Sequence, residues 1–228
     1  MTRRVLSLVA VALFALVFLR IAASYTEQTA LRPLADFFVT QGPLELGAPN
    51  VVTGILLGYR GFDTLGEVAV LFMVAAAVGL LLKPADASAQ HEAAGPPPSE
   101  IVRTGTKILL PVIFTFGAYV IANGHLSAGG GFQGGAIVAS GAMLIMLGRP
   151  DGRLDTALLG VIESFAGIFY VAVGLLGLAL AGGFLDPRFL PRGEFGAFIS
   201  AGAIPITSAL LGIKVGAELS VIIARFRG

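Results

Sequence analysis

The chain has 228 residues, of which 56% are hydrophobic and 13% are charged, and its formal net charge is +1. Because a soluble domain carries about 25% charged residues, this composition indicates a membrane protein, and the small net charge argues against a nucleic-acid partner. The chain has no cysteine, only two histidines, His91 and His125, and no nucleotide-binding motif, so we expect neither disulfides nor a bound metal or cofactor.

The first apolar run, residues 5–19, is expected to enter the membrane. Arg3 and Arg4 before it fit the basic start of a signal peptide. The sequence that begins at Arg20 is a poor cleavage site, however, and the segments that follow are themselves apolar. We therefore favour an uncleaved membrane anchor.

Residues 26–49 contain several helix breakers and are expected to form a polar loop, in which only residues 34–39 make one amphipathic turn. The next segment, residues 50–60 (NVVTGILLGYR), is apolar but too short to span a bilayer. We expect an interfacial or re-entrant helix over these residues.

A break at residues 61–64 is predicted to separate this short helix from the second membrane span, residues 65–82. Asp63 or Thr64 is expected to cap the span by accepting hydrogen bonds from free backbone amides. Residues 1–82 are thus predicted to form a unit with two spans.

Residues 83–100 (KPADASAQHEAAGPPPSE) differ from the rest of the chain because they are rich in alanine and proline. This composition is typical of a flexible linker. We expect the linker to join the two-span unit to a second unit, residues 101–228, and to mark a gene fusion.

The second unit contains four apolar runs, which predict four membrane helices. They cover residues 104–122, 134–148, 156–181 and 195–224. Pro111 and Pro205 lie inside the first and the last of these runs and are expected to kink them. The chain is therefore predicted to be an all-α polytopic membrane protein with about six transmembrane helices, two plus four.

The placement of lysine and arginine predicts the orientation, because cytoplasmic loops are enriched in both residues. A cytoplasmic N-terminus places more of these residues inside than outside. Those inside are Arg3, Arg4, Lys83, Arg103, Arg149, Arg153, Arg225 and Arg227, and those outside are Arg20, Arg32, Arg60, Arg188 and Arg192. Both termini are thus expected to face the cytoplasm, in a multi-pass protein of the cell's inner membrane.

Ionisable side chains inside membrane helices are costly, and they are the best pointers to function in a protein of this class. Lys214 precedes Arg225 by about 16 Å of helix and is expected near the middle of the membrane. Glu218 follows one turn later on the same helix face. Two interpretations remain open, a mutually neutralised packing pair and a station in an ion or proton path.

Glu163 has no cation within reach along its own helix, so it needs one from another helix or takes up a proton, and we favour a functional role. Glu67 begins the second span, where a carboxylate suits the helix dipole, and Lys107 can extend to the headgroups. Structural roles are favoured for these two. The candidates for an ion pathway are Glu67, His125, Glu163, Lys214 and Glu218.

Residues 123–143 (NGHLSAGGGFQGGAIVASGAM) combine a polar loop with a glycine-rich helix start. His125 can relay protons near neutral pH, but it is equally typical of an interfacial loop. Because glycine permits sharp turns and close helix approach, alanine at Gly130 or Gly134 should be tolerated poorly. The residues predicted to serve turns and packing are Gly129, Gly130, Gly131, Gly134 and Gly135, together with Pro205.

The segment GHLSAGGGFQGGAIVASGA, residues 124–142, closely resembles the signature of the MnhB-like subunits of Mrp-type multisubunit cation/proton antiporters. It also resembles the equivalent subunit of energy-converting membrane-bound hydrogenases. NVVTGILLGYRGFDTLGEVAVL, residues 50–71, is similar to the C-terminal segment of the large, A-type antiporter subunit, or to the small free-standing subunit that corresponds to it. The two matches lie on either side of the linker, with the A-type segment first, as a fusion of neighbouring subunits would have them.

The resemblance implies a non-catalytic helper subunit in a module that exchanges a cation, with sodium as the first candidate, for protons. Its partners would be other membrane subunits, including the large antiporter subunits, and the lipid bilayer. A purely structural scaffold and the equivalent subunit of a redox-driven ion pump are alternatives. An intramembrane enzyme that uses His125 and Ser127 is a weaker alternative, because the two residues lack a third group to orient them.

Overall fold

The computed structural model describes residues 2–27, 29–82, 98–149 and 154–227, and all the regular elements in these ranges are helices. The chain divides into two compact units, residues 1–36 and residues 37–228. The first unit contains α1 (Thr2–Ser24), whose described side chains are exposed along the whole helix. The N-terminal apolar run is therefore a helix of a length and composition that suit a membrane crossing.

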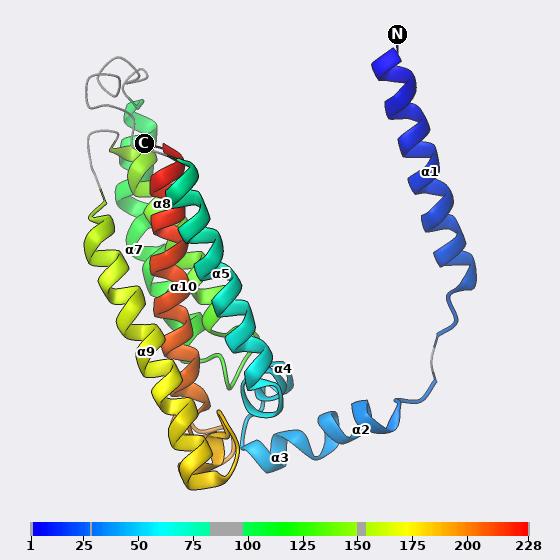
Figure 1. Ribbon diagram of the computed structural model, residues 1–228, viewed down its shortest axis with the longest axis vertical. Coiled ribbons are helices and arrows are strands. Elements are labelled where there is room, and N and C mark those ends of the chain that lie inside the picture. The colour runs from blue at the N-terminus through cyan, green and yellow to red at the C-terminus, as the bar shows by residue number, and fades with distance from the viewer. Residues whose placement is uncertain (1, 28, 83–97, 150–153, 228) are drawn as a thin grey trace. The chain divides into compact units, whose positions relative to one another are not determined.

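The second unit is built around five long helices that stand side by side (Figure 1). These are α5 (Gly61–Leu81), α7 (Glu100–Ala122), α8 (Gly131–Gly148), α9 (Thr156–Ala181) and α10 (Ile204–Arg227). α10 packs against each of the other four and is the most buried of the five. With α1, they make six helices within the described ranges that could span a membrane, and this confirms the predicted all-α polytopic fold.

The polar loop expected at residues 26–49 is partly helical, so this prediction is wrong. α2 (Pro33–Thr40) and α3 (Gly42–Leu46) lie within it. Pro33 and Pro43 stand in the first turns of these helices, where proline sacrifices no hydrogen bond and its fixed φ favours the helix. Proline was expected to break regular structure here, but at the first turn it starts a helix.

The short helix expected at residues 50–60 is present as α4 (Val51–Gly54), which continues directly into a π-helix, η1 (Ile55–Tyr59). The break expected at residues 61–64 is wrong, because α5 already begins at Gly61. The interruption falls at Arg60, whose φ of −120° and ψ of 30° lie outside the helical region.

Neither of the expected caps of α5 acts as one. Asp63 accepts a hydrogen bond of 2.6 Å from Nε of Arg60, and the Thr64 hydroxyl donates to the carbonyl oxygen of Leu56 at 2.9 Å. The threonine therefore provides a hydrogen-bond donor for a carbonyl oxygen of the π-helix. This carbonyl needs a donor because the preceding segment folds as a π-helix, which the sequence did not predict.

α10 begins at Ile204 and not at residue 195, which corrects the predicted role of Pro205. The proline occupies the first turn of the helix, a position that it favours, so it does not kink the interior of the span. Residues 182–203 instead form a connection between α9 and α10 that contains one short 3-10 helix, η2 (Pro187–Phe189). Pro111 lies inside α7, as predicted.

Two glycines make the turn that leads into α8. Gly129 has a φ of 153° and Gly130 a φ of 144°, in a region of backbone conformation that side chains with a Cβ rarely adopt. The backbone conformation of this turn therefore requires glycine at both positions, as predicted.

Close backbone contact joins α8 to α7 and to α10. A Cβ at Gly134 would overlap the Ile121 side chain and lie 2.8 Å from the carbonyl oxygen of Gly117, both in α7. On the other side, a Cβ at Gly135 would lie 2.9 Å from the carbonyl oxygen of Gly212 in α10. Small residues thus bring three helices into contact at backbone distance, as in other membrane bundles.

α5 is fastened to α10 near the C-terminal ends of both helices. The Arg225 guanidinium donates through Nη1 to the carbonyl oxygen of Ala75 at 2.7 Å. Its side chain lies directly against Gly79, where a Cβ would overlap it. This contact, together with the packing of the two helices, joins residues 37–82 to the rest of the second unit.

Some of the predicted organisation falls outside the described residues. The linker at residues 83–100 lies almost entirely there, and so does His91. At the end of the linker, the Ser99 hydroxyl accepts a hydrogen bond from the backbone N–H of Val102 and caps α7. The division into sequence units and the orientation in the membrane stay predictions.

Candidate functional site

Three charged side chains meet in the middle of the bundle, and we call them the Lys214 cluster. The Lys214 ammonium of α10 lies 2.8 Å from Oε1 of Glu163 on α9 and 3.1 Å from Oε2 of Glu218, one turn further along α10. All three residues are buried, and Glu218 is completely so. The contact expected within α10 is present, and Glu163 finds its cation on another helix.

The helices place the cluster at membrane depth. Lys214 lies about 15 Å along α10 from its first residue, Ile204, which is half the thickness of the hydrocarbon core. Gly167 of α9, one turn from Glu163, leaves room for the lysine stem, because a Cβ there would already touch its Cδ at 3.8 Å. The Phe72 ring of α5 covers the ammonium at 5.6 Å, a cation–π distance.

The charges in the cluster do not cancel. One ammonium faces two carboxylates, so the cluster has a formal charge of −1 when all three groups are ionised. Oε1 of Glu218 is buried and has no hydrogen-bond partner among the described residues. An uncompensated charge at this depth is costly, so the cluster has a strong tendency to take up one further positive charge.

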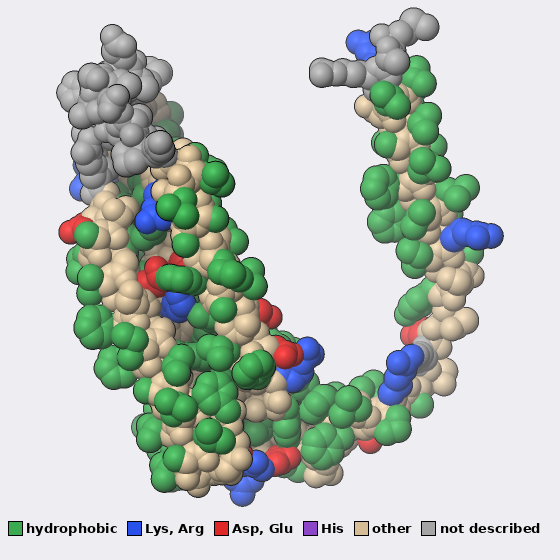
Figure 2. Space-filling model, in the orientation of Figure 1, with side chains coloured by type: hydrophobic (Ala, Val, Ile, Leu, Met, Phe, Trp, Pro, Cys, Tyr) green, Lys and Arg blue, Asp and Glu red, His purple; other side chains and the backbone are tan. Residues whose placement is uncertain are grey.

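The cluster reaches the flank of the bundle. The side chains of Lys214 and Glu163 keep 8% and 11% of their surface exposed. Figure 2 shows red and blue side chains together at mid-height between α9 and α5, bordered by green and tan atoms.

A second polar site joins the two segments that resemble antiporter subunits, residues 50–71 and residues 124–142. The Asn50 side-chain amide donates to the carbonyl oxygens of Gly124 and Ser127, both at 2.7 Å. Its backbone N–H donates to the carbonyl oxygen of His125 at 3.0 Å. Thr53 donates through its hydroxyl to the carbonyl oxygen of Gly129 at 3.2 Å. The start of the NVVTG segment thus holds the glycine-rich loop in its turn.

His125 is fully buried in this loop and takes no part in the Lys214 cluster. Its Nε2 lies 3.1 Å from the carbonyl oxygen of Phe198, which can only accept, so Nε2 carries the proton. Nδ1 is buried and has no partner among the described residues. The Ser127 hydroxyl donates to the carbonyl oxygen of Asn123, so the two residues do not form the pair that a hydrolytic enzyme would need.

Burial lowers the pKa of His125, although the carbonyl oxygens of Phe198 and Ala197 oppose the shift. The unfolded chain therefore binds more protons than the folded chain below about pH 6.5, the ordinary pKa of histidine. The free energy of unfolding is expected to fall as the pH drops from 7.5 to about 5.5.

Thermal unfolding of the purified protein at several pH values checks this expectation. His125→Gln should lose most of the pH dependence in this window, and His91→Gln should keep it. If His91→Gln removes the pH dependence and His125→Gln does not, the assignment to His125 is wrong.

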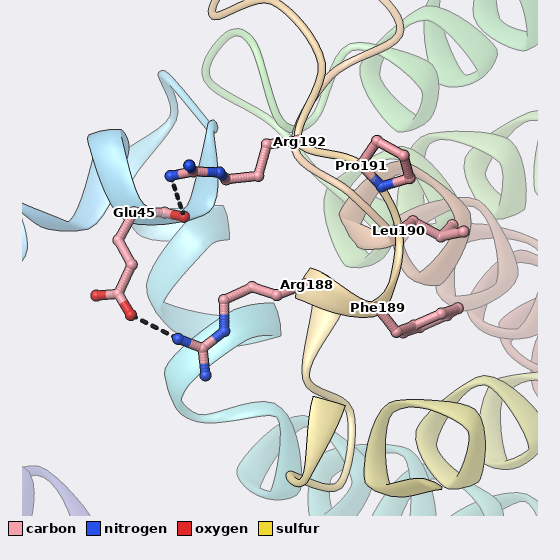
Figure 3. A pocket seen from close by; sticks show the side chains of 6 residues that line it. All are labelled: Glu45, Arg188, Phe189, Leu190, Pro191 and Arg192. Carbon is pink, nitrogen blue, oxygen red and sulfur yellow. Dashed lines mark hydrogen bonds and ion pairs between the residues drawn. The ribbon is translucent and has the colours of Figure 1, made fainter. Parts of the chain in front are cut away.

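Charged residues also clasp α3 to the connection at residues 182–203. Arg188 donates to Glu45 at 2.8 Å and to both carboxylate oxygens of Asp186, which lowers the pKa of that carboxyl. Arg192 reaches the carbonyl oxygen of Leu44 at 2.9 Å. Figure 3 shows both arginines pointing toward Glu45 across an open pocket. Because protein groups already pair with them, the arginines act as a structural clasp.

Glu67, the remaining candidate for the ion pathway, lies apart from the Lys214 cluster. Glu67 is exposed on α5, as its predicted role at the start of a span allows.

The sequence interpretation missed Tyr170, a buried tyrosine of α9 whose hydroxyl has no partner among the described residues. Its spacing of seven residues from Glu163, which places both on one helix face, is the signal that could have found it.

Two family models match the chain. One is described as a domain related to the MnhB subunit of Na+/H+ antiporters and matches residues 101–221. The other describes MbhE, a subunit of MBH, and matches residues 3–94. The first match covers more than half of the chain, and the two matches meet in the predicted linker.

Relatives and solved structures agree with these matches. A probable K+/H+ antiporter A/B subunit of Rhizobium meliloti is 28% identical over 88% of this chain, and the chain spans 23% of that protein. An uncharacterized protein of Methanocaldococcus jannaschii is 28% identical, over 75% of this chain and 74% of that protein.

Among solved structures, a chain of an archaeal membrane-bound sulfane sulfur reductase, a respiratory complex, is 33% identical. It superposes with a TM-score of 0.83 over 99% of this chain and 98% of its own. A chain of the Mrp complex from Dietzia sp. is 23% identical, with a TM-score of 0.78 over the whole of this chain and 26% of its own, and shares the fold.

Proposed function

Since the chain belongs to the family of domains related to the MnhB subunit of Na+/H+ antiporters, we propose that it contributes the Lys214 cluster to ion translocation within an Mrp-type module. The chain is a membrane subunit of an Mrp-type antiporter or of a related respiratory membrane complex. Within such a complex its proposed role is non-catalytic: it helps to move the cation and to assemble the module.

The observation that carries the proposal is the position and charge of the Lys214 cluster. Buried ionisable residues near the midplane of a membrane bundle mark ion and proton pathways. A scaffold gains nothing from two carboxylates around one ammonium, because well-packed apolar residues stabilise a buried site as well or better. A cluster with an excess negative charge, in contrast, can accept a proton or a monovalent cation and release it again.

Sodium and protons are the proposed ions of the module. The names of the matching family, which refers to Na+/H+ antiporters, and of the Rhizobium relative, which refers to a K+/H+ antiporter, support exchange of an alkali cation for protons. The chain itself is proposed to lie in the inner membrane with both termini in the cytoplasm. Its proposed partners are the large antiporter subunits, because the Rhizobium relative carries an A/B name and is far longer than this chain.

A redox-driven complex is the second candidate. It is favoured by the archaeal sulfane sulfur reductase, whose chain is 33% identical and matches this chain from end to end. In that setting the same cluster would move ions in response to electron transfer in other subunits.

Purification of the native assembly tests the proposal. A tagged copy of the chain, extracted from its own membrane in a mild detergent, is expected to bring down other multi-pass subunits, among them long antiporter subunits. If redox subunits co-purify as well, the second candidate function, a subunit of a redox-driven complex, is correct. A chain that is recovered without any other membrane protein, after extraction in several detergents, would contradict both candidates.

A further inference from the structure

Tyr170 combines features that packing alone does not explain. The residue is 2% exposed and lies in the apolar core of the bundle with Leu211 and Ile204 of α10. Its hydroxyl oxygen is buried and has no hydrogen-bond partner among the described residues. A buried hydroxyl without a partner costs free energy, and a phenylalanine would fill the same space without that cost.

The position of Tyr170 relates it to the Lys214 cluster. Tyr170 and Glu163 are seven residues apart on α9, which puts them on one face of the helix about 10 Å apart along its axis. Glu163 holds the Lys214 ammonium, so Tyr170 lies about two turns from the cluster, toward the end of the bundle that contains residues 182–203.

α5 supplies a carboxylate at the level of Tyr170. Glu67 is exposed on α5 and directly precedes Val68, which lies in the same buried core cluster as Tyr170. Phe72, five residues further along α5, lies over the Lys214 ammonium. Along α5, Glu67 therefore lies near the level of Tyr170, and Phe72 lies at the level of the Lys214 cluster.

We propose that Tyr170 is a proton-relay residue that connects the Glu67 carboxyl group with the Lys214 cluster. A phenol hydroxyl can accept one hydrogen bond while it donates another. When a proton on the Glu67 carboxyl passes to the phenol oxygen, the original hydroxyl proton leaves toward the cluster, and Tyr170 is neutral again. Water molecules bridge the distance that remains to Glu163 and Glu218, and the excess negative charge of the cluster attracts the proton.

This inference rests on the proposed function and makes one part of it specific. It assigns the proton, and not the metal cation, to the route through Glu67 and Tyr170. It also gives Glu67 a role in transport, whereas the sequence alone favoured a structural one.

The test uses the purified complex in lipid vesicles, with internal pH followed by a fluorescent dye while a sodium gradient, or the complex's own redox reaction, drives transport. Tyr170→Phe keeps the ring and removes only the hydroxyl. We expect the rate of proton movement to fall roughly tenfold, with the same subunits in the purified complex and a thermal stability equal to or above that of the wild type. Tyr119→Phe, at an exposed tyrosine of α7, is the matched control and should transport normally.

Three results would overturn the inference. Tyr170→Phe could move protons at the wild-type rate, it could slow transport no more than Tyr119→Phe does, or it could fail to assemble, which would show a structural role. Lys214→Met separates the two proposals. If it is inactive while Tyr170→Phe is normal, only the relay is wrong, and if both are normal, the proposed function is wrong as well.

Discussion

Replacing Lys214 with methionine is expected to lower coupled transport by the assembled complex at least about tenfold. Methionine keeps the length of the side chain but removes the ammonium that Glu163 and Glu218 share at 2.8 and 3.1 Å. Two buried carboxylates then lack a cation, which costs about 3–5 kcal/mol unless they bind protons. Transport by the reconstituted complex and its thermal stability measure the two effects.

A triple variant separates transport from stability. Lys214→Met combined with Glu163→Gln and Glu218→Gln removes every charge of the cluster, so stability should return toward that of the wild type while transport stays low. Lys107→Met, at an exposed lysine of α7, controls for the loss of a positive charge. A triple variant that transports like the wild type would show that the cluster is a packing device and that the pathway lies in other subunits.

Replacing Gly131 with alanine is expected to prevent stable folding of the bundle. Gly131 is the first residue of α8, and a Cβ there would overlap the carbonyl oxygen of Ser208 and lie 2.9 Å from the backbone nitrogen of Gly212, both in α10. Because these are backbone atoms, no rotamer change relieves the overlap, and α8 and α10 must move apart. We expect a loss of about 3 kcal/mol or more, measured as the melting temperature and yield of the detergent-solubilised protein.

Gly160→Ala is the matched control for this prediction. Gly160 lies inside α9, and a Cβ at this position would meet nothing within 4 Å. Alanine also favours a helix interior over glycine, so this variant should be as stable as the wild type or more stable by about 0.5–1 kcal/mol. Equal stability of the two variants would show that the close approach of α8 and α10 is not needed for folding.

The spans and the pair within α10 could be predicted from the sequence because both depend on local periodicity. Apolar run length sets the six helices, and a spacing of four residues sets the Lys214–Glu218 contact. A contact of Lys214 with Glu163 was one possibility that the sequence left open, and it could not be decided in advance because it depends on how α9 packs against α10.

Pro205 and Tyr170 show why other parts of the fold and of the site were harder to predict. A proline starts a helix or kinks it depending on where the helix begins, and the start of α10 is decided by the packing of residues 182–203. Tyr170 looks like an ordinary apolar residue of a membrane helix. Only the folded bundle shows that its hydroxyl is enclosed without a partner among the described residues.

The hydrogen bonds of Asn50 and Thr53 to the loop at residues 123–130 have a consequence for assembly. The two segments they join match separate family models, yet here they belong to one polypeptide. Covalent connection turns their docking into an intramolecular event, which raises the effective concentration of each segment for the other. It also fixes their stoichiometry at one to one, so neither segment can accumulate in the membrane without the other to cover its polar backbone groups.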